Sequence, residues 1–397
     1  MLDFVRAYEE RVRGLVIFPR ANTPKARKIL LHGAPKCGKT SLALDLVRHY
    51  KRAILVDCAD LRLEVEEAQA ELLKQVLEKR FDALIIDNYR PELTIPTHQD
   101  IIIVAPSPRH IPESIRTSFT THCVRPLNFE EYVSCSKSNK LESIFASFLK
   151  EGNLPELPYI PESKRPQRIQ EIIMLYAREN TDIFTFLLRY QGKPFSTHNA
   201  YCLLKQQQKI SKDKIYALIQ TLQDEQVIFT LPHATQRESK LYFYNFALPY
   251  ALSSAPNFQS IFENMIFCEL VHAGIRAYYD ESCDFIVDCA LDSALESSMC
   301  EAMSGVAGDV ANAITSNAQN RAKNDTISGV AIFALAFPTP MLIESKLAKL
   351  TRTFDEILFI SIDTTLPPTK HARGNYRAIS FIDFALEYLH LLKQHCV

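Results

Sequence analysis

A complete phosphate-binding loop near the N-terminus constrains the fold of this chain more than any other segment. Residues Gly33–Thr40 read GAPKCGKT and match the pattern G-x-x-x-x-G-K-[ST] at every fixed position. An apolar run, 29–31, precedes the loop and a helix-like stretch, 41–50, follows it. This strand–loop–helix context predicts a nucleotide site at the edge of a parallel α/β sheet. A simple turn beside a solvated lysine is the alternative, and it leaves the adjacent Lys-Thr pair unexplained.

The residue types in the loop suit the chemistry of a triphosphate. Glycine lets the backbone approach phosphate oxygens closely, and the N-terminus of the following helix adds partial positive charge. Lys39 is expected to reach the β- and γ-phosphates, while the hydroxyl of Thr40 binds Mg²⁺. We therefore expect ATP and Mg²⁺ as ligands. The predicted nucleotide-binding residues are Gly33, Ala34, Pro35, Lys36, Cys37, Gly38, Lys39, Thr40 and Ser41.

A second acid for the metal is expected at the end of the apolar run Ala83–Asp87, which reads ALIID. Asp87 is the candidate, with a turn-capping acid as the alternative. Many ATPases of this kind place Glu next, to orient the attacking water, whereas this chain has Asn88. Asn can hold a water but cannot take its proton, so we expect nucleotide binding with slow hydrolysis. The candidate catalytic residues are Lys39, Asp87 and Asn88, and Glu92 is an alternative base.

Length and composition bound the organisation and the partners. At 397 residues the chain is too long for one core, which predicts two or three domains. With 45 Lys and Arg against 46 Asp and Glu, no global charge favours nucleic acid or a membrane. The ten Cys form no C-x-x-C pair, which favours buried thiols in the cytoplasm and argues against a zinc site. The longest apolar segment, Gly329–Phe337, is too short to cross a bilayer.

Strand and helix patterns alternate between residues 28 and 125, which predicts a parallel sheet covered by helices. An amphipathic helix is expected before it, over residues 4–15. Ser107 follows the fourth expected strand, where it is either a polar sensor of the γ-phosphate or a turn residue. The expected strands are 29–31, 53–57, 84–87 and 101–105, with a charged helix over 62–80.

Two later segments carry a family resemblance. Residues 125–132 (RPLNFEEY) and 148–156 (FLKEGNLPE) resemble the PLSFEEF and FLxxGGLPE signature of prokaryotic AAA-type P-loop ATPases related to the origin-recognition and archaeal ATPases. Asn88 and Asn153 depart from that pattern. The resemblance implies an Arg that acts on a neighbour's nucleotide, for which Arg116 is the nearest match and Arg109 competes, so an oligomer is compatible with the sequence. It also implies three domains: an ATPase domain (1–158), a winged helix (159–250) and a degenerate PD-(D/E)XK nuclease-like domain (251–397).

The middle region has the helix and strand order of a winged helix-turn-helix. Helices are expected over 169–180, 183–190, 199–207 and 211–223, and strands over 227–231 and 241–246. A phosphate-facing strip would supply nonspecific DNA contact, although Asp213, Asp224 and Glu225 dilute its charge. A module used only for packing is the alternative. The strip comprises Lys205, Lys209, Lys212, Lys214, Arg237 and Lys240.

In the last third, the resemblance places Glu263 and Asp284 where a nuclease-like fold holds two metal ligands. The Glu-x-Lys pair that such a site also needs is replaced by Ala334 and Ala336 on the expected strand 330–337. Residues 344–346 (ESK) match Glu-x-Lys, but they begin a helix-like stretch. We therefore expect a packing or interaction domain, with an active metal-dependent nuclease as the alternative.

The remaining segments of the last third carry no chemistry. A helix is expected over 262–270, a strand over 277–279 and a closing helix over 381–394. Residues 290–326 read as an insertion without a motif.

Together these patterns predict an ATP-dependent switch. A non-hydrolysing ATP-binding scaffold for a protein partner is the competing hypothesis.

Overall fold

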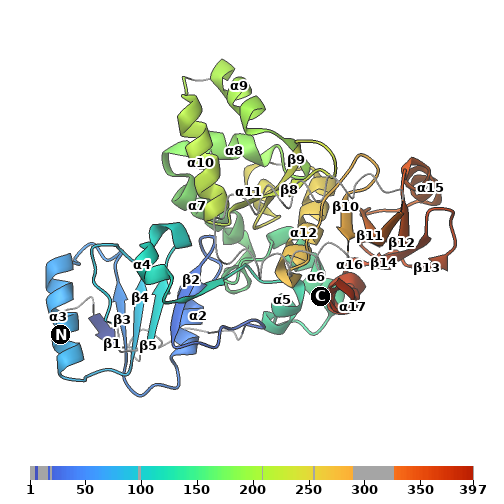
Figure 1. The fold of residues 1–397 in the computed structure, drawn as a ribbon. Coiled ribbons are helices and arrows are strands. Elements are labelled where there is room, and N and C mark those ends of the chain that lie inside the picture. The colour runs from blue at the N-terminus through green and yellow to red at the C-terminus, as the bar shows by residue number, and fades with distance from the viewer. Residues whose placement is uncertain are drawn as a thin grey trace. The chain divides into compact units, whose positions relative to one another are not determined.

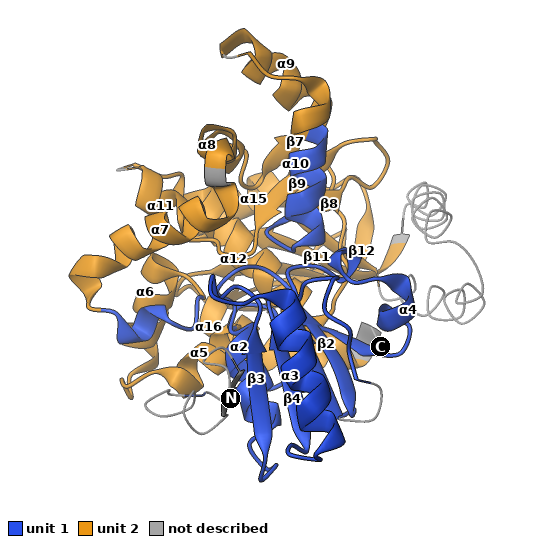
Figure 2. Cartoon of the chain, turned by 90° about the vertical axis from the view of Figure 1, so that its left-hand side faces the viewer, with its two compact units in different colours: residues 1–127, 154–160, 216–228 blue, residues 128–153, 161–215, 229–397 orange. Residues whose placement is uncertain are grey.

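The computed structural model describes residues 5–7, 17, 20–96, 100–207, 209–253, 255–288 and 326–396. Contacts divide the chain into two compact units (Figure 2). Unit 1 comprises residues 1–127, 154–160 and 216–228, and unit 2 comprises residues 128–153, 161–215 and 229–397. The predicted domain boundaries at residues 158 and 250 stay predictions. Within the described ranges, no helix combines the length and the apolar character needed to span a bilayer.

Unit 1 is built on a sheet with the strand order β1-β3-β4-β5-β2-β6 (Figure 1). Five of its strands are parallel, and β1 (Val5–Ala7) pairs antiparallel with β3 at one edge. The predicted α/β fold with a parallel sheet is therefore confirmed. The parallel strands are β2 (Lys28–His32), β3 (Ala53–Asp57), β4 (Ala83–Asp87), β5 (Asp100–Val104) and β6 (Thr120–Cys123).

The N-terminal segment differs from its prediction. Residues 5–7 form strand β1, where an amphipathic helix was expected, because their backbone pairs with β3. The other residues of that expected helix lie outside the described part of the chain. Strand β6 was not anticipated, because its sequence TTHC is polar and lacks the apolar run of its neighbours.

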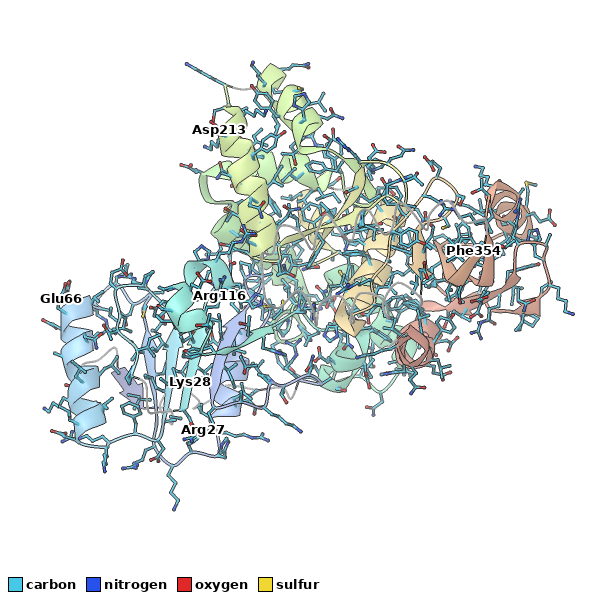
Figure 3. The ribbon with its side chains drawn as sticks, in the orientation of Figure 1. Arg27, Lys28, Glu66, Arg116, Asp213 and Phe354 are labelled. Carbon is cyan, nitrogen blue, oxygen red and sulfur yellow. The ribbon has the colours of Figure 1, made fainter. Side chains whose placement is uncertain are left out.

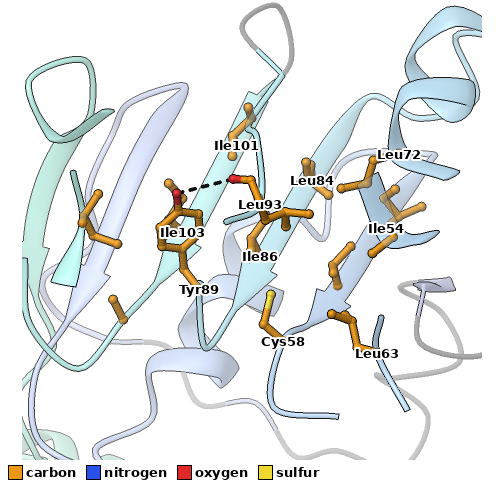
Figure 4. Packing of buried hydrophobic residues seen from close by; sticks show 14 of the residues in the cluster. Ile54, Cys58, Leu63, Leu72, Leu84, Ile86, Tyr89, Leu93, Ile101 and Ile103 are labelled. Carbon is orange, nitrogen blue, oxygen red and sulfur yellow. Dashed lines mark hydrogen bonds between the residues drawn. The ribbon is translucent and has the colours of Figure 1, made fainter. Parts of the chain in front are cut away.

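Helices cover both faces of this sheet, and successive side chains of each strand pack on one face and then on the other. Leu55 and Ile85 pack with Leu42 of α2 (Lys39–Leu46) on one face. Their neighbours Ile54 and Leu84 pack on the other face, against α3 (Val65–Leu77), where Figure 4 shows the cluster. Successive side chains of a strand point to opposite faces. Asp57 and Asp87, next in the series after Leu55 and Ile85, therefore point to the face of α2.

Most of the two segments that resemble the AAA-type family lies in unit 2, namely residues 128–132 and 148–153. Helix α5 (Phe129–Cys135) starts with a reciprocal capping box between Asn128 and Glu131. Helix α6 (Leu141–Glu151) ends at a glycine with φ of 84°, and Asn153 next to it donates to the carbonyl of Tyr244 at 3.0 Å. The departure at Asn153 thus supplies a buried hydrogen bond that glycine could not make.

A run of helices and a three-stranded sheet form the middle of the chain. The sheet order is β7-β9-β8, and the predicted helices and strands are all present with bounds shifted by a few residues. The winged-helix assignment itself stays a prediction. The elements are α7 (Arg165–Ala177), α8 (Thr181–Leu188), β7 (Lys193–Phe195), α9 (Thr197–Gln207), α10 (Lys212–Asp224), β8 (Ile228–Pro232) and β9 (Ser239–Phe243). Figure 3 labels Asp213 in the first turn of α10.

The C-terminal part of unit 2 is a mixed five-stranded sheet of order β10-β11-β12-β14-β13. Strand β10 (Phe285–Asp288) is antiparallel to β11 (Thr326–Ala334), which is parallel to β12 (Thr353–Ser361) and through it to β14 (Asn375–Ser380). The order begins at β10 and ends at β13 (Leu366–Thr369), which is antiparallel to β14.

Among the described residues, helical segments before, between and after these strands also belong to this part of the chain. They are α12 (Phe258–Ala273), α15 (Pro340–Lys349) and a closing stretch of α16 (Phe381–Asp383), a π-helical turn (Phe384–Tyr388) and α17 (Leu389–Cys396). The expected strand at 277–279 is reduced to isolated bridges at Tyr278 and Tyr279. The predicted insertion 290–326 lies outside the described residues, except that Thr326 begins β11.

Candidate functional site

The phosphate-binding loop has the backbone that its glycines predict. Gly33 has φ of 135° and Gly38 has φ of 96°, conformations that L side chains rarely adopt. A Cβ added to Gly33 would collide with the carbonyl oxygen of Val124. The Gly33 amide donates to Pro106 at 3.2 Å, which fixes the loop to the end of β5. Gly33, Ala34 and Cys37 are buried, Pro35, Gly38, Lys39 and Thr40 are half-buried, and Lys36 and Ser41 are exposed.

Lys39 folds back over the loop that precedes it. Its Nζ donates to the carbonyl oxygens of Gly33 and Ala34, both at 2.8 Å. These carbonyls hold the ammonium at the mouth of the loop and at the N-terminus of α2. A bound polyphosphate would offer the ammonium charged oxygens in their place, and charge-assisted hydrogen bonds are the stronger kind.

Thr40 and Asp87 meet, as a shared metal site requires. The Thr40 hydroxyl donates to Asp87 Oδ2 at 2.7 Å, although the two residues lie 47 positions apart. Asp87 is 4% exposed, and burial raises its pKa, with the charge of Asp57 acting in the same direction. The Thr40 hydroxyl and the Asp87 carboxylate both offer oxygen atoms, the ligands that Mg²⁺ prefers. Mg²⁺ commonly binds one or two carboxylates together with phosphates. In the described ranges, no three acidic, His or Cys side chains gather into a separate metal site.

The side chain of Asn88 is hydrogen-bonded to the neighbouring strand β3. Its φ of 52° takes the backbone out of the extended conformation, and its Nδ2 donates to Asp57 Oδ1 at 3.0 Å. Asp57 lies directly opposite Asp87 in the parallel register of β3 and β4. Sequence reasoning did not select Asp57. The available signal was that AILVD and ALIID are two apolar strands that end in the same acid.

Positive charge surrounds the base of the loop. Burial, followed by the charges of Lys39, His122 and Arg125, lowers the pKa of His32 to about 4, so this imidazole is neutral. Burial and the charges of Arg125 and Arg20 also lower the pKa of His122. The buried atoms His32 Nδ1 and Arg125 Nε have no hydrogen-bond partner among the described residues. A cationic neighbourhood with an unpaired Arg125 Nε–H donor suits an anionic ligand.

Arg20 fastens the loop to the end of β6. Its Nη1 donates to Cys37 O at 3.1 Å, and its Nη2 donates to Arg125 O at 2.7 Å and Pro126 O at 3.2 Å. Sequence reasoning missed this residue, because an isolated arginine before the first strand has no motif around it.

The other predicted residues of the ATPase domain have local partners. Ser107 is buried, and its Oγ accepts from the Arg109 amide at 3.2 Å, which is the turn role. Arg109 itself pairs with Asp224 at 2.8 Å. Arg116 ends α4 (Glu113–Arg116), where Figure 3 labels it. Glu92 is exposed in the turn after β4. The sensor and arginine-finger roles stay predictions.

The two predicted nuclease-type acids enclose a lysine. Lys240 Nζ lies 2.8 Å from Glu263 Oε1 and 3.6 Å from Asp284 Oδ1, and 5.0 Å from the ring centroid of Tyr279. Burial, with the charge of Asp284, raises the pKa of Glu263. Burial disfavours the charge of Lys240, yet the two acids raise its pKa, so the ammonium is retained. Lys240 was a candidate member of the phosphate-facing strip, but its side chain is only 12% exposed and pairs with these carboxylates.

On β11, the Ala334 amide donates to Asp284 Oδ2 at 3.1 Å. The nuclease-like assignment of this region stays a prediction. Lys346 of α15 lines a cavity of about 250 Å³ together with Lys240 and Asp284, whereas Glu344 is exposed. The Glu-x-Lys pair is therefore divided between the cavity and the surface.

The rest of the predicted basic strip is exposed. Lys214 lies 3.3 Å from Glu179. The exposed members are Lys205, Lys209, Lys212, Lys214 and Arg237.

No protein-family model matches this chain, and no curated protein matches it significantly in sequence.

Proposed function

We propose that this protein binds ATP with Mg²⁺ and acts as a nucleotide-dependent switch of the AAA type with slow hydrolysis. The observation that carries the proposal is the hydrogen bond from Thr40 to Asp87, formed directly beside a complete phosphate-binding loop. A turn with a solvated lysine would require neither this bond nor the closeness of Lys39 to the loop carbonyls.

Each residue has a role that follows from its position. Amides of the loop and of the first turn of α2 hold phosphate oxygens, and Lys39 Nζ exchanges its two carbonyl partners for the β- and γ-phosphates. Thr40 and Asp87 would hold Mg²⁺, which neutralises charge on the transferred phosphoryl group. Asn88 lacks a proton-accepting group, so turnover is slow.

The test is nucleotide titration by calorimetry, beside phosphate release measured with and without DNA. Wild-type protein should bind ATP, and Lys39→Ala should weaken binding and abolish release. Lys74→Ala, an exposed lysine of α3, serves as the matched control and should leave both unchanged. Absence of ATP affinity in folded wild-type protein refutes the proposal. Tight binding without Lys39-dependent release favours the competing scaffold for a protein partner.

The other two domains support accessory roles. The element order α8, α9, α10, β8, β9 supports a winged helix, whose exposed lysines suit nonspecific DNA contact. The mixed C-terminal sheet supports a nuclease-like fold, and Lys240 between Glu263 and Asp284 argues against a metal there. Free thiols suit a cytoplasmic location, and they are carried by Cys37, Cys58, Cys123, Cys135, Cys202, Cys268 and Cys283. Mg²⁺-dependent DNA cleavage that Asp284→Ala removes would instead establish the nuclease.

A further inference from the structure

We propose that Asp57 accepts the proton of the attacking water, with Asn88 as its positioning residue, so that two adjacent strands share the work of one Asp-Glu pair. This inference rests on the proposed ATP site. It explains how a chain with Asn after its metal-side acid hydrolyses ATP at all.

The first observation is where the two carboxylates lie. Asp57 and Asp87 are paired residues at the ends of β3 and β4, and each lies two positions after a residue, Leu55 or Ile85, that packs with α2. Parallel strands end at the same edge of the sheet, where ligands of such folds bind. Both acids therefore face the side on which the phosphate-binding loop leads into its helix.

The second observation is that both carboxylate oxygens of Asp87 already accept hydrogen bonds. Its Oδ2 accepts from Thr40, and its Oδ1 accepts from the backbone amide of Asn88 at 3.0 Å. A metal-side acid cannot also serve as the base, because its lone pairs are directed to the cation. Asp57 is the next carboxylate along the edge. The phosphate-binding loop follows β2. In the strand order β3-β4-β5-β2, Asp87 lies on β4 and Asp57 lies on β3, one strand further from the loop.

The third observation is that the Asp57 carboxylate is oriented. Its Oδ1 accepts from Asn88 Nδ2 at 3.0 Å and from the Ala59 amide at 3.0 Å. Asn88 reaches it because its left-handed backbone turns the side chain toward β3. Two donors on one oxygen fix the plane of the carboxylate, which is half-buried and open to solvent.

The reaction balances with these groups. The water oxygen attacks the γ-phosphorus, and the bond from that phosphorus to the β–γ bridging oxygen breaks, with its electron pair leaving on ADP. One water proton passes to an oxygen of Asp57 and from there to solvent. Aspartate on the neighbouring strand takes over the function that a glutamate directly after Asp87 serves elsewhere.

The decisive variant is Asp57→Asn in the full chain, which keeps the shape and removes the proton acceptor. We expect ATP affinity within about threefold of wild type and hydrolysis lower by about 10²–10³-fold, since general bases contribute about 10²–10⁴-fold. The affinity for ADP with aluminium fluoride, which mimics the transferring phosphoryl group, should fall at least about tenfold, because that state alone uses the base. Asp82→Asn, at the opposite end of β4, is the matched control and should match wild type in all three measurements.

The role of Asn88 is tested in the same assays. Asn88→Ala should lower hydrolysis by about tenfold with ATP affinity retained, and the double variant should be no slower than Asp57→Asn, because residues that act as a unit are non-additive. Hydrolysis in Asp57→Asn equal to wild type overturns the inference. Wild-type binding without any hydrolysis also overturns it while leaving the ATP site intact, whereas absence of ATP binding refutes the proposed function itself.

Discussion

Replacing Lys240 by Met should strongly destabilise unit 2. The side chains of Lys240, Glu263 and Asp284 are 12%, 9% and 16% exposed, and the substitution removes the only cation between the two acids among the described residues. Removing one partner of a buried ion pair costs about 3–5 kcal/mol, because the remaining charge stays desolvated and unpaired. Two carboxylates remain here, so we expect the upper part of that range at pH 8.

The pH dependence has a defined sign. Burial and Asp284 already raise the pKa of Glu263 above its ordinary value of 4.5, and loss of the ammonium raises it further. A carboxyl with a raised folded-state pKa contributes most stability below its unfolded value and loses that stability as the pH rises. The deficit of Lys240→Met should therefore shrink between pH 8 and pH 5.

The assay is urea unfolding followed by circular dichroism and tyrosine fluorescence, since the chain contains no Trp. Lys205→Met is the matched control, because the Lys205 ammonium lies 5.7 Å from the ring centroid of Tyr201 on an exposed helix. It should change the unfolding free energy by about 1 kcal/mol or less. Adding Glu263→Gln should recover part of the Lys240→Met deficit. A Lys240→Met deficit below about 1 kcal/mol, or one equal at both pH values, refutes the reasoning.

Three further changes have defined outcomes. Gly33→Ala should lower ATP affinity at least about tenfold in fluorescent-nucleotide titration, because a Cβ there collides with Val124 O and strains a positive φ; unchanged affinity would contradict the loop geometry. Burial raises the pKa of Glu269 to about 8, so wild-type stability should fall as the pH rises from 4.5 to 8, by up to about 1.4 kcal/mol per unit. Glu269→Gln should flatten that slope in urea unfolding, and an unaltered slope would exclude Glu269 as its source. Arg20→Ala breaks three hydrogen bonds, including the one to Cys37 O, and should lower stability by about 1–3 kcal/mol in thermal melting; a melting temperature equal to wild type would mean that the clamp is dispensable.

The four central strands of the N-terminal sheet, β2 to β5, were predictable because they are mainly apolar runs between polar turns. Residues 53–57 and 83–87 are buried on both faces, which leaves no alternation to misinterpret. The C-terminal strands β12 and β14 were missed for the opposite reason. Their sequences, TFDEILFIS and NYRAIS, mix charged and apolar residues, so no clear period marks them.

Two site residues depended on contacts that no local pattern contains. Asp57 becomes notable only when the register pairs it with Asp87. The sequence alone suggests that Lys240 is an exposed basic residue of a wing. The structure places Glu263, 23 positions away, beside it. Long-range pairing of charges is a property of the fold, and a single sequence does not report it.

The left-handed backbone at Asn88 also governs how the proposed ATP site can be re-engineered. Installing the usual glutamate there would force a longer side chain into a conformation that disfavours it by about 1–2 kcal/mol. The substitution would also remove the side-chain amide that hydrogen-bonds to Asp57, and it would add a third carboxylate beside Asp57 and Asp87. Placing the conventional glutamate in the proposed site therefore requires remodelling both strand ends together, because a single substitution at Asn88 strains the backbone and removes the hydrogen bond to Asp57.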